Sequence, residues 1–560
     1  MKHFKTLFIT SILLFGTVEL QAQMNKRQWV KSTMKLMTQR EQIAQLFVVV
    51  CHPQQGEAHI NKVLETISRE QPGSIIWGEY TPEAYVHLLN KMQSLVRIPL
   101  LVTMDAEWGV SMRIDSVIRF PQQLTLGAIQ DDNLIYDFGL EVARQCKELG
   151  IHVNYAPVVD VNSNPKNPVI GMRSFGENKY KVTEKAYAYL KGMQDGGVLT
   201  SLKHFPGHGD TDRDSHEELP VILHDTERLN DVELYPFREL IQRGASGVMT
   251  GHLLIPAFDS VIASQSKVIC TDLLQKRLKF KGLIYTDALE MKGALYKRDT
   301  AKVALYSLLA GNDILEIPID IKKSIDEIEK ALKNKEISKK YIQKKCKKIL
   351  EAKYDLGLHK GVQPIDPSGI LNRLNTDHTK SLRIKLSESS LTLLSNRNNV
   401  LPLNAQNIQY MEIGQGSTLR EQMADKGVAN MIRINPNDTK ERLDSLATNV
   451  NNNIIVVGYH NIPRGRSSIN FGVDSLITEF LDQLTKEHQV VLLFFGNPYT
   501  INNLKDIERF AAIVVAYDNS EEAQVATAKA LFGQSGFLGK LPATINEGYK
   551  EDFGVIIRHI

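Results

Sequence analysis

The stretch GLIYTDA at residues 282–288 sets the pattern for the first half of the chain. It is a short apolar run with aromatic and β-branched residues, it begins with a glycine, and an aspartate stands near its end. Longer amphipathic stretches lie on both sides of it. This alternation is typical of repeated βα units around a parallel sheet, so the stretch predicts one buried strand.

Similar runs recur along residues 40 to 350. In chain order the eight runs are Gln45–Val50, Ser74–Trp77, Leu100–Asp105, Val153–Val161, Thr200–Phe205, Gly247–Leu253, Gly282–Ala288 and Asp313–Ile317. Helical patterns such as Leu134–Leu149 and Lys181–Met193 separate them, with Gly150 and Gly196-Gly197 as stops. Eight strands alternating with helices predict a (β/α)₈ TIM-like barrel, whose active site lies at the C-terminal strand ends.

Polar residues stand at the ends of four of these runs. Asp105 ends the third run, Lys203 and His204 lie in the fifth, His252 in the sixth and Asp287 in the seventh. Charged groups in otherwise apolar runs are unfavourable unless they converge on a site. Their repeated placement at the same strand end therefore predicts a functional site at the mouth of the barrel.

The densest polar segment is KHFPGHGDTDRDSH at residues 203–216. Its glycines and proline allow the chain to leave a strand and fold over the barrel mouth. Asp214 and His216 lie two positions apart, so in an extended loop they share a side, and the carboxylate can orient the imidazole. Such a pair suits acid and base catalysis, and Asp287 at a rigid strand end suits a nucleophile facing it.

These segments resemble glycoside hydrolase family 3, in its β-N-acetylglucosaminidase subgroup, over nearly the whole mature chain. The resemblance rests on KHFPGHGDTDRDSH at 203–216, GLIYTDALEMKGA at 282–294, RSFG at 173–176, DAEWGVSMR at 105–113, LLSNRNNVLPL at 393–403 and LFGQSGFLGKLP at 531–542. The first two segments are the most specific. The last two look like the accessory domain of that family.

The resemblance implies a retaining mechanism with named residues. Asp287 is the nucleophile that forms a glycosyl-enzyme intermediate, His216 protonates the leaving oxygen and then activates water, and Asp214 orients His216. The residues expected to hold the non-reducing sugar are Asp105, Arg113, Arg173, Lys203 and His204. A carboxylate and cationic donors suit contacts with sugar hydroxyls. No cofactor or metal is expected.

A histidine as the proton carrier points to a substrate with a 2-acetamido sugar, because related glucosidases of the family usually use a glutamate from elsewhere. The alternative within the family is a β-glucosidase. One departure from the family pattern concerns the glycine pair that commonly follows the residue matching Glu107, where this chain has Trp108-Gly109. Trp108 either stacks on a sugar or fills the barrel rim.

Two alternatives lie outside this assignment. A metal-dependent hydrolase on the same barrel would use His204, His208, His216 and His252 as ligands, since imidazoles suit zinc. Its usual HxH pair after the first strand is replaced here by His52-Pro53. A non-catalytic carbohydrate-binding protein is the other alternative, and the intact set of Asp214, His216 and Asp287 argues against it.

The rest of the chain predicts a second domain. A catalytic barrel over 23–353 is followed by a Gly- and Pro-containing linker at 354–385 and by a smaller α/β sandwich domain at 386–560. Its predicted strands are Leu391–Ser395, Ile408–Ile413, Asn453–Tyr459, Gln489–Gly496 and Ala511–Tyr517. Gly414-Gln415-Gly416 lacks the third glycine of a dinucleotide-binding motif, since Leu419 stands there. The second domain closes the cleft, binds polymer or forms a dimer; its residues do not decide among these.

Composition sets limits on location and partners. The 560 residues carry a net charge of +3, so no global field points to nucleic acid, and the Lys-rich patch 333–353 is interpreted as a solvated helical face. Residues 1–22 resemble a secretory signal peptide, which predicts an exported protein, periplasmic or extracellular, without a membrane span in its mature form. The four cysteines have no metal-binding spacing and are expected to be buried thiols, although one disulfide stays possible after export. The oligomeric state is left open.

Overall fold

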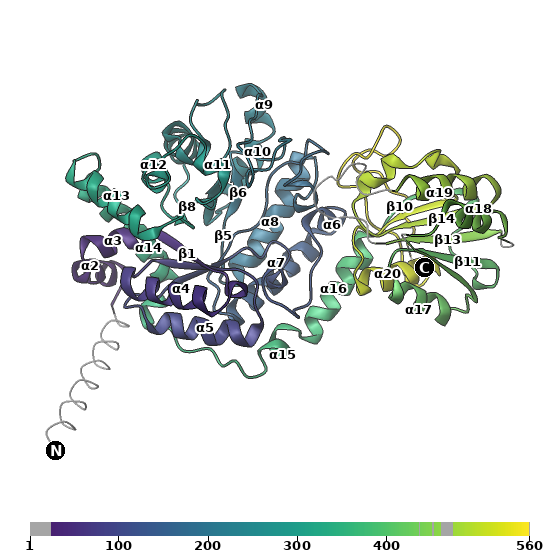
Figure 1. Cartoon of the computed structure of the whole chain (residues 1–560), viewed down its shortest axis with the longest axis horizontal. Helices are drawn as coiled ribbons and strands as arrows, with labels where there is room; N and C mark the ends of the chain where they lie inside the picture. The colour runs from purple at the N-terminus through teal and green to yellow at the C-terminus, as the bar shows by residue number, and fades with distance from the viewer. Residues whose placement is uncertain (1–23, 436, 451–452, 461–473, 559–560) are drawn as a thin grey trace, which may run out of the picture.

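The computed structural model describes residues 24–435, 437–450, 453–460 and 474–558. The predicted signal peptide at 1–22 lies outside these residues. Within the described ranges, no helix combines the length and the apolar character that a membrane-spanning helix needs. Two lobes, a larger N-terminal one and a smaller C-terminal one, lie side by side, and helix α16 (Asp377–Ser390) connects them (Figure 1).

The larger lobe is a closed parallel barrel. Its strands are β1 (Phe47–Cys51), β2 (Ser74–Trp77), β3 (Leu101–Met104), β4 (Val153–Asn154), β5 (Leu199–Thr200), β6 (Leu202–Phe205), β7 (Gly247–Thr250), β8 (Leu283–Thr286) and β9 (Leu315–Glu316). β5 and β6 together form the fifth predicted run. The order β5-β4-β3-β2-β1-β9 continues through the bridge between Tyr285 and Ile314 into β8-β7-β6, and the bridge between Val158 and Lys203 closes the ring. The predicted barrel class is confirmed.

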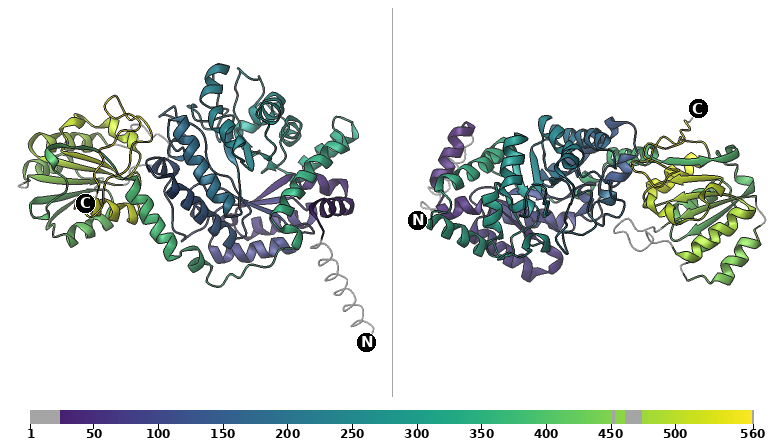
Figure 2. Two further views of the ribbon diagram at one scale, coloured as in Figure 1. Left: turned by 180° about the vertical axis from the view of Figure 1, so that it is seen from behind. Right: turned by 90° about the horizontal axis from the view of Figure 1, so that it is seen from above.

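Helices follow the strands and surround the barrel, as the views from behind and from above show (Figure 2). The main ones are α4 (Glu57–Glu70), α5 (Pro82–Ser94), α7 (Asp132–Glu148), α8 (Lys179–Asp195), α10 (Leu234–Gln242), α12 (Val303–Ala310), α13 (Ile321–Lys333) and α14 (Lys339–Asp355). The side chain of Asn178 caps the start of α8, and the helix ends just before Gly196. The predicted stops at Gly150 and Gly196 are therefore confirmed.

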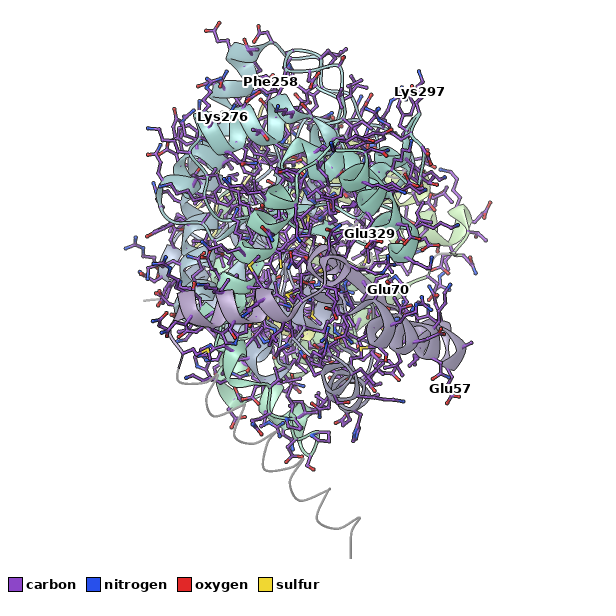
Figure 3. The ribbon with its side chains drawn as sticks, turned by 90° about the vertical axis from the view of Figure 1, so that its left-hand side faces the viewer. Glu57, Glu70, Phe258, Lys276, Lys297 and Glu329 are labelled. Atoms are coloured by element: carbon purple, nitrogen blue, oxygen red, sulfur yellow. The ribbon has the colours of Figure 1, made fainter. Side chains whose placement is uncertain are left out.

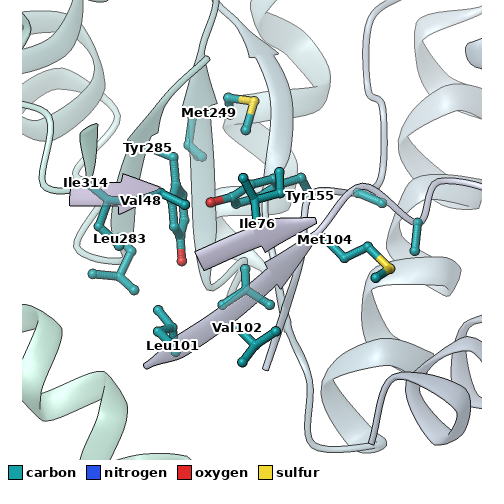
Figure 4. Close-up of a cluster of buried hydrophobic side chains, with 14 of the residues drawn as sticks. Val48, Ile76, Leu101, Val102, Met104, Tyr155, Met249, Leu283, Tyr285 and Ile314 are labelled. Carbon is teal, nitrogen blue, oxygen red and sulfur yellow. The ribbon is translucent and has the colours of Figure 1, made fainter. Parts of the chain in front are cut away.

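Apolar side chains fill the interior of the barrel beneath its mouth. Val48, Ile76, Tyr155, Tyr285 and Ile314 are buried and point into the ring of strands (Figure 4). The rings of Tyr155 and Tyr285 meet edge to face, with 5.2 Å between their centroids. This packed layer supports the polar strand ends above it, and the residue two positions further along a strand points into the next layer.

The opposite end of the barrel is held by ion pairs. Arg40 in α3 (Gln39–Ala44) contacts Glu70 at the end of α4 and Glu329 on α13, at 2.8 Å each; Figure 3 shows both glutamates.

The interpretation of the Lys-rich patch 333–353 as a solvated helical face is partly wrong. Lys345 is buried against Asp313 at 2.6 Å, and Lys353 is buried against Gln45. Burial lowers the pKa of Lys353 to about 7.

The smaller lobe is a three-layer α/β sandwich. Its sheet has the order β10 (Thr392–Asn396), β15 (Ala512–Val515), β14 (Gln489–Phe494), β13 (Ile454–Tyr459), β11 (Ile408–Ile413) and β12 (Asn430–Ile434). All its neighbours are parallel except β10 and β15. α18 (Lys440–Thr448) and α19 (Ser475–Glu487) cover one face, and α17 (Ser417–Asp425) and α20 (Glu521–Leu531) cover the other (Figure 1). The edge strand β12 was not predicted.

The segment predicted as a linker is largely structured. It contains α15 (Ile370–Leu374) and the start of α16, and Ile370, Leu374 and Leu382 are buried in the barrel core cluster. Arg383 is buried as well; it donates to the carbonyl oxygen of Arg119 and forms an ion pair with Asp518 of the smaller lobe. The chain between the lobes is therefore packed against both of them.

Candidate active site

Five charged side chains form a network at the barrel mouth, and two of them, Glu107 and Lys203, are buried. Lys203 Nζ lies 2.7 Å from Asp105 Oδ1 and 2.8 Å from Glu107 Oε1. Arg173 binds Glu107 with two hydrogen bonds of 2.7 and 2.9 Å. Arg113 contacts the other oxygen of Asp105 at 3.2 Å. The predicted sugar-binding residues Asp105, Arg113, Arg173 and Lys203 are thus brought together, with Glu107 as their common anchor.

Burial and pairing act against each other in this network. Burial opposes the charge of Glu107, but Arg173 and Lys203 outweigh it and hold the pKa of Glu107 below its ordinary value. Burial also opposes the charge of Lys203, whereas Asp105 and Glu107 raise its pKa. Glu107 and Lys203 are therefore both charged at neutral pH, and their geometry is fixed before a ligand arrives.

His204 is held from below by a buried aspartate. Its Nδ1 lies 2.8 Å from Asp160 Oδ2, and its backbone N–H also donates to that carboxylate. The backbone N–H of His208 donates to Asp160 at 2.7 Å. Nε2 of His204 lies 3.4 Å from Arg173 and faces the mouth. Asp160 therefore orients His204, the fifth predicted sugar-binding residue, and holds the backbone of the loop that follows β6 at His208.

Asp287 follows β8 and is partly buried in the mouth. Its Oδ1 accepts a hydrogen bond from the N–H of Ala288 at 2.8 Å, and its own N–H donates to Thr250 on β7. Burial opposes ionisation, yet His204, His252 and the Ala288 N–H hold the pKa of Asp287 below its ordinary value. The carboxylate is thus ionised at neutral pH, as a nucleophile must be.

Asp214 and His216 form the expected pair, but on a turn and not on an extended loop. Nδ1 of His216 lies 2.7 Å from Asp214 Oδ1, and the backbone N–H of His216 donates to the same oxygen at 2.9 Å. The N–H of Glu217 donates to the carbonyl of Asp214, which closes the turn. The turn brings the imidazole back onto the carboxylate, because aspartate side chains readily bind the backbone two residues further on.

The loop that carries this pair is docked onto the segment after β8. The carbonyl of Ser215 accepts a hydrogen bond from the N–H of Gly293 at 3.2 Å. A Cβ at Gly293 would lie 3.0 Å from that carbonyl oxygen and 3.2 Å from Cβ of His252, so a glycine allows the close approach. On the inner side, Nε2 of His208 lies 3.2 Å from the hydroxyl of Ser215. The contact between Ser215 and Gly293 thus places the residue before His216 against the segment that follows Asp287.

The smaller lobe supports the segment that carries Arg173. The N–H of Glu177 donates to the carbonyl of Pro542 at 3.1 Å, and Met172 is buried in the core cluster of the smaller lobe. A Cβ at Gly176 would lie 2.2 Å from the same carbonyl oxygen. The segments RSFG and LFGQSGFLGKLP therefore contact each other directly.

Sequence reasoning missed three of the acidic residues that shape the mouth. Glu107 anchors the cation network, Asp160 orients His204, and Glu316 lies at the end of β9. Each stands at or just after a predicted strand, the same position that identified Asp105 and Asp287. The signal was therefore present, although it does not say which of these acids faces a ligand.

One group among the described residues has the composition of a metal site. The ligand atoms of Asp210, His224 and Glu233 lie within 4.8 Å of one another. Arg228 lies 3.3 Å from Glu233 and 3.8 Å from Asp210, so a guanidinium already supplies positive charge there. We interpret the cluster as an ionic tether, meaning a set of charged contacts that hold the loop after β6 in place.

The four histidines of the metal-dependent alternative do not make such a group in the described part of the chain. His208 binds Thr211 and Ser215, and His252 binds Ser264 and the carbonyl of Ala288. These hydrogen bonds use both ring nitrogens of each imidazole.

Trp108 and the cysteines were left open or uncertain by the sequence. Trp108 is partly exposed at the rim, with the guanidinium of Arg119 5.2 Å from its ring centroid. Stacking of Trp108 on a sugar stays a prediction. Cys51, Cys146, Cys270 and Cys346 are all buried free thiols.

Comparison with protein-family models gives two matches. The model described as "Glycosyl hydrolase family 3 N terminal domain" matches residues 38–352, and the model described as "Glycosyl hydrolase family 3 C-terminal domain" matches residues 391–554. The first covers the barrel and the second covers the sandwich lobe.

Individual relatives agree with these models. A β-hexosaminidase A of Pseudoalteromonas piscicida is 37% identical over 288 residues, which is 47% of this chain and 48% of the relative, so the match spans about half of that protein. A "Beta-N-acetylglucosaminidase/beta-glucosidase" of Cellulomonas fimi is 24% identical over 92% of this chain and 95% of its own length. The solved structure of a glycoside hydrolase family 3 β-N-acetylglucosaminidase from Paenibacillus sp. covers 91% of this chain and 99% of its own length, with 28% identity and a TM-score of 0.78.

Proposed function

Because the chain belongs to glycoside hydrolase family 3, we propose that it is a retaining exo-β-N-acetylglucosaminidase that removes terminal β-linked N-acetylhexosamine. The observation that carries the proposal is that the loop with the His216–Asp214 pair is docked onto the segment that follows Asp287, beside the charged network of Asp105 and Lys203. Retaining cleavage needs a nucleophile and a proton donor on either side of the scissile bond.

Asp287 attacks the anomeric carbon in the first step. An oxygen of its carboxylate forms a bond to that carbon while the bond to the leaving oxygen breaks, which gives a covalent glycosyl-aspartate. The N–H of Ala288 holds the carboxylate in place, and the lowered pKa keeps it ionised. In the second step water takes the place of the leaving group and releases the sugar with its configuration retained.

His216 moves the protons in both steps. Asp214 accepts a hydrogen bond from Nδ1, which fixes the tautomer and leaves Nε2 for proton transfer. The protonated imidazole gives its proton to the leaving oxygen, and the neutral imidazole then removes a proton from water. The Asp214 carboxylate stabilises the imidazolium form.

The sugar itself is held by the network around Glu107. Asp105 accepts from ring hydroxyls, and Nε2 of His204 can accept or donate, whereas Lys203, Arg113 and Arg173 only donate. Because ion pairs and Asp160 already orient these groups, little ordering is needed when the sugar binds. A small set of preorganised contacts of this kind suits a single terminal sugar.

A β-glucosidase is the second candidate, and the double name of the Cellulomonas fimi relative favours keeping it. The test is to compare kcat/KM for an aryl β-N-acetylglucosaminide and the matching aryl β-glucoside, with Asp287→Asn as the inactive control. The proposal expects the N-acetylglucosaminide to be cleaved faster. Faster cleavage of the glucoside would overturn the assignment, and cleavage of neither would leave the non-catalytic alternative in its place.

We also propose that the protein is exported to the periplasm or the extracellular space. The support is the order of a basic region, a short apolar region and small residues over 1–22. Expression of the full chain in a bacterial host should give a mature protein that starts at Gln23, as measured by intact mass. A protein that keeps Met1 and stays in the cytoplasm would contradict export.

A further inference from the structure

Glu316 lies in the same interior layer of the barrel as Asp287. Tyr285 and Ile314 are bridged on the neighbouring strands β8 and β9, and both side chains point into the barrel (Figure 4). Two positions later on each strand come Asp287 and Glu316. Because side chains two apart share a face, Glu316 points into the mouth beside Asp287.

Hydrogen bonds fix the backbone of Glu316, but one oxygen of its carboxyl group is unpaired. Its N–H donates to the hydroxyl of Thr286 at 2.9 Å, and its carbonyl accepts from the N–H of Leu289 at 2.8 Å. The residue is 3% exposed, and Oε2 has no hydrogen-bond partner among the described residues. A buried polar group without a partner costs about 1–3 kcal/mol, so this placement needs a reason.

The two tyrosine hydroxyls nearby do not provide that partner. The hydroxyl group of Tyr285 is buried and lacks a hydrogen bond among the described residues, and the side chain of Tyr155 interacts with that of Thr103. Glu316 interacts electrostatically with both tyrosines, so the three side chains lie close together beneath the mouth. Oε2 of Glu316 is therefore left unpaired by its neighbours and is available to a ligand at the mouth.

The charges around Glu316 determine its protonation state. Burial raises its pKa well above the ordinary value, and the carboxylates of Asp105 and Asp287 add to the effect, against the smaller opposing influence of Lys203 and Arg113. These influences favour the uncharged acid, which has one O–H donor. It thus differs from Asp105 and Asp287, which are ionised and only accept.

We propose that Glu316 is a further sugar-binding residue, whose carboxyl group forms a hydrogen bond with one hydroxyl of the hexosamine held between Asp105 and Asp287. This inference rests on the proposed function. It assigns strand β9, the eighth predicted run, a role in recognising the substrate.

The test combines variants of Glu316 with substrates that each lack one hydroxyl. An aryl β-N-acetylglucosaminide and its 3-, 4- and 6-deoxy analogues are compared in wild type, Glu316→Gln and Glu316→Leu. We expect Glu316→Leu to lower kcat/KM on the parent substrate about tenfold, and Glu316→Gln to keep most activity because the amide still donates. On the one deoxy analogue that lacks the contacted hydroxyl, wild type and Glu316→Leu should have the same kcat/KM.

A buried glutamate at the other end of the barrel supplies the control. Glu70→Leu removes the partner of Arg40 and is expected to lower the melting temperature without changing the ranking of the deoxy substrates. An equal loss for Glu316→Leu on all four substrates would overturn the inference. If that variant does not fold, a crystal structure of wild type with N-acetylglucosamine decides. A Glu316 oxygen within about 3.2 Å of a sugar hydroxyl supports the contact, and its absence overturns it.

These outcomes are separable from the proposed function. A wild-type enzyme that cleaves no N-acetylglucosaminide refutes the function itself. An active wild type whose Glu316→Leu variant shows the uniform loss refutes only the role of Glu316.

Discussion

The strand ends and the loop after β6 hold their functional groups in different ways. At the strand ends, Glu107 and Lys203 are buried and joined by ion pairs between residues that are far apart in the sequence. On the loop, the side chain of His216 is 60% exposed, and Asp214 lies only two residues away. The loop is docked at its edges through Ser215 and Asp210.

This contrast shows which part of the chemistry depends on the fold. The sugar-binding charges are set by the barrel and are paired with one another, so removing one of them disturbs both stability and the reaction. The proton carrier is set by a local turn, so changing it should alter the reaction and leave the barrel intact. The predictions below test this division, from the largest expected effect to the smallest.

Replacement of the nucleophile should have the largest effect. Asp287→Asn is expected to reduce kcat on an aryl β-N-acetylglucosaminide by about 10⁴-fold or more, because the amide cannot form the glycosyl bond. The melting temperature is expected to change little, since the amide keeps the shape of the side chain. A variant with near wild-type turnover would show that another residue is the nucleophile.

The second prediction compares one ion pair from each region. Arg173→Ala leaves Glu107 buried without its bidentate partner and should lower the free energy of unfolding by about 3–5 kcal/mol. Arg213→Ala removes the exposed pair with Glu218 on the loop and should lower it by less than about 1 kcal/mol. Denaturant unfolding measures both. Equal losses would break the proposed distinction between the regions.

The third prediction concerns the proton carrier. His216→Ala should slow substrates with poor leaving groups by about 10²–10³-fold, because their leaving oxygen must be protonated. A dinitrophenyl glycoside needs little protonation, so its glycosylation step should be nearly unaffected, which pre-steady-state measurements can show. The melting temperature should match that of wild type. A loss independent of the leaving group would count against an acid role for His216.

The smallest expected effect is that of a chelator. Prolonged incubation with EDTA should leave both kcat/KM and the melting temperature unchanged, because Arg228 supplies the positive charge between Asp210 and Glu233. Loss of activity that added zinc restores would favour the metal-dependent alternative. A drop in melting temperature alone would instead assign a structural metal to the tether of the loop.

The sequence predicted the elements whose pattern is local. The apolar runs predicted all eight barrel strands, and the glycines predicted where α7 and α8 end. Strand β12 was missed because Asn430–Ile434 is a partly exposed edge strand. The Lys-rich α14 was judged by composition alone. Burial of Lys345 depends on Asp313, which is supplied by a different element.

In the candidate site, too, the sequence predicted what depends on local pattern and missed what depends on contacts between distant residues. Asp105 and Asp287 were found by their place at strand ends, and the resemblance to the family added Arg113, Arg173 and the roles of the loop residues. Glu107, Asp160 and Glu316 stand in equivalent positions, but their roles depend on which side chains the barrel brings to face them. The turn at Asp214 was also missed, because an i to i+2 pair is compatible with an extended chain and with a turn.

The most direct test of the account is to trap the covalent intermediate. A 5-fluoro N-acetylglucosaminyl fluoride reacts through its good leaving group, while the ring fluorine slows the release of the sugar. After digestion, mass spectrometry of the labelled protein should place one sugar on Asp287. A label on any other residue, or hydrolysis of the substrate with inversion and no label, would contradict the proposed mechanism.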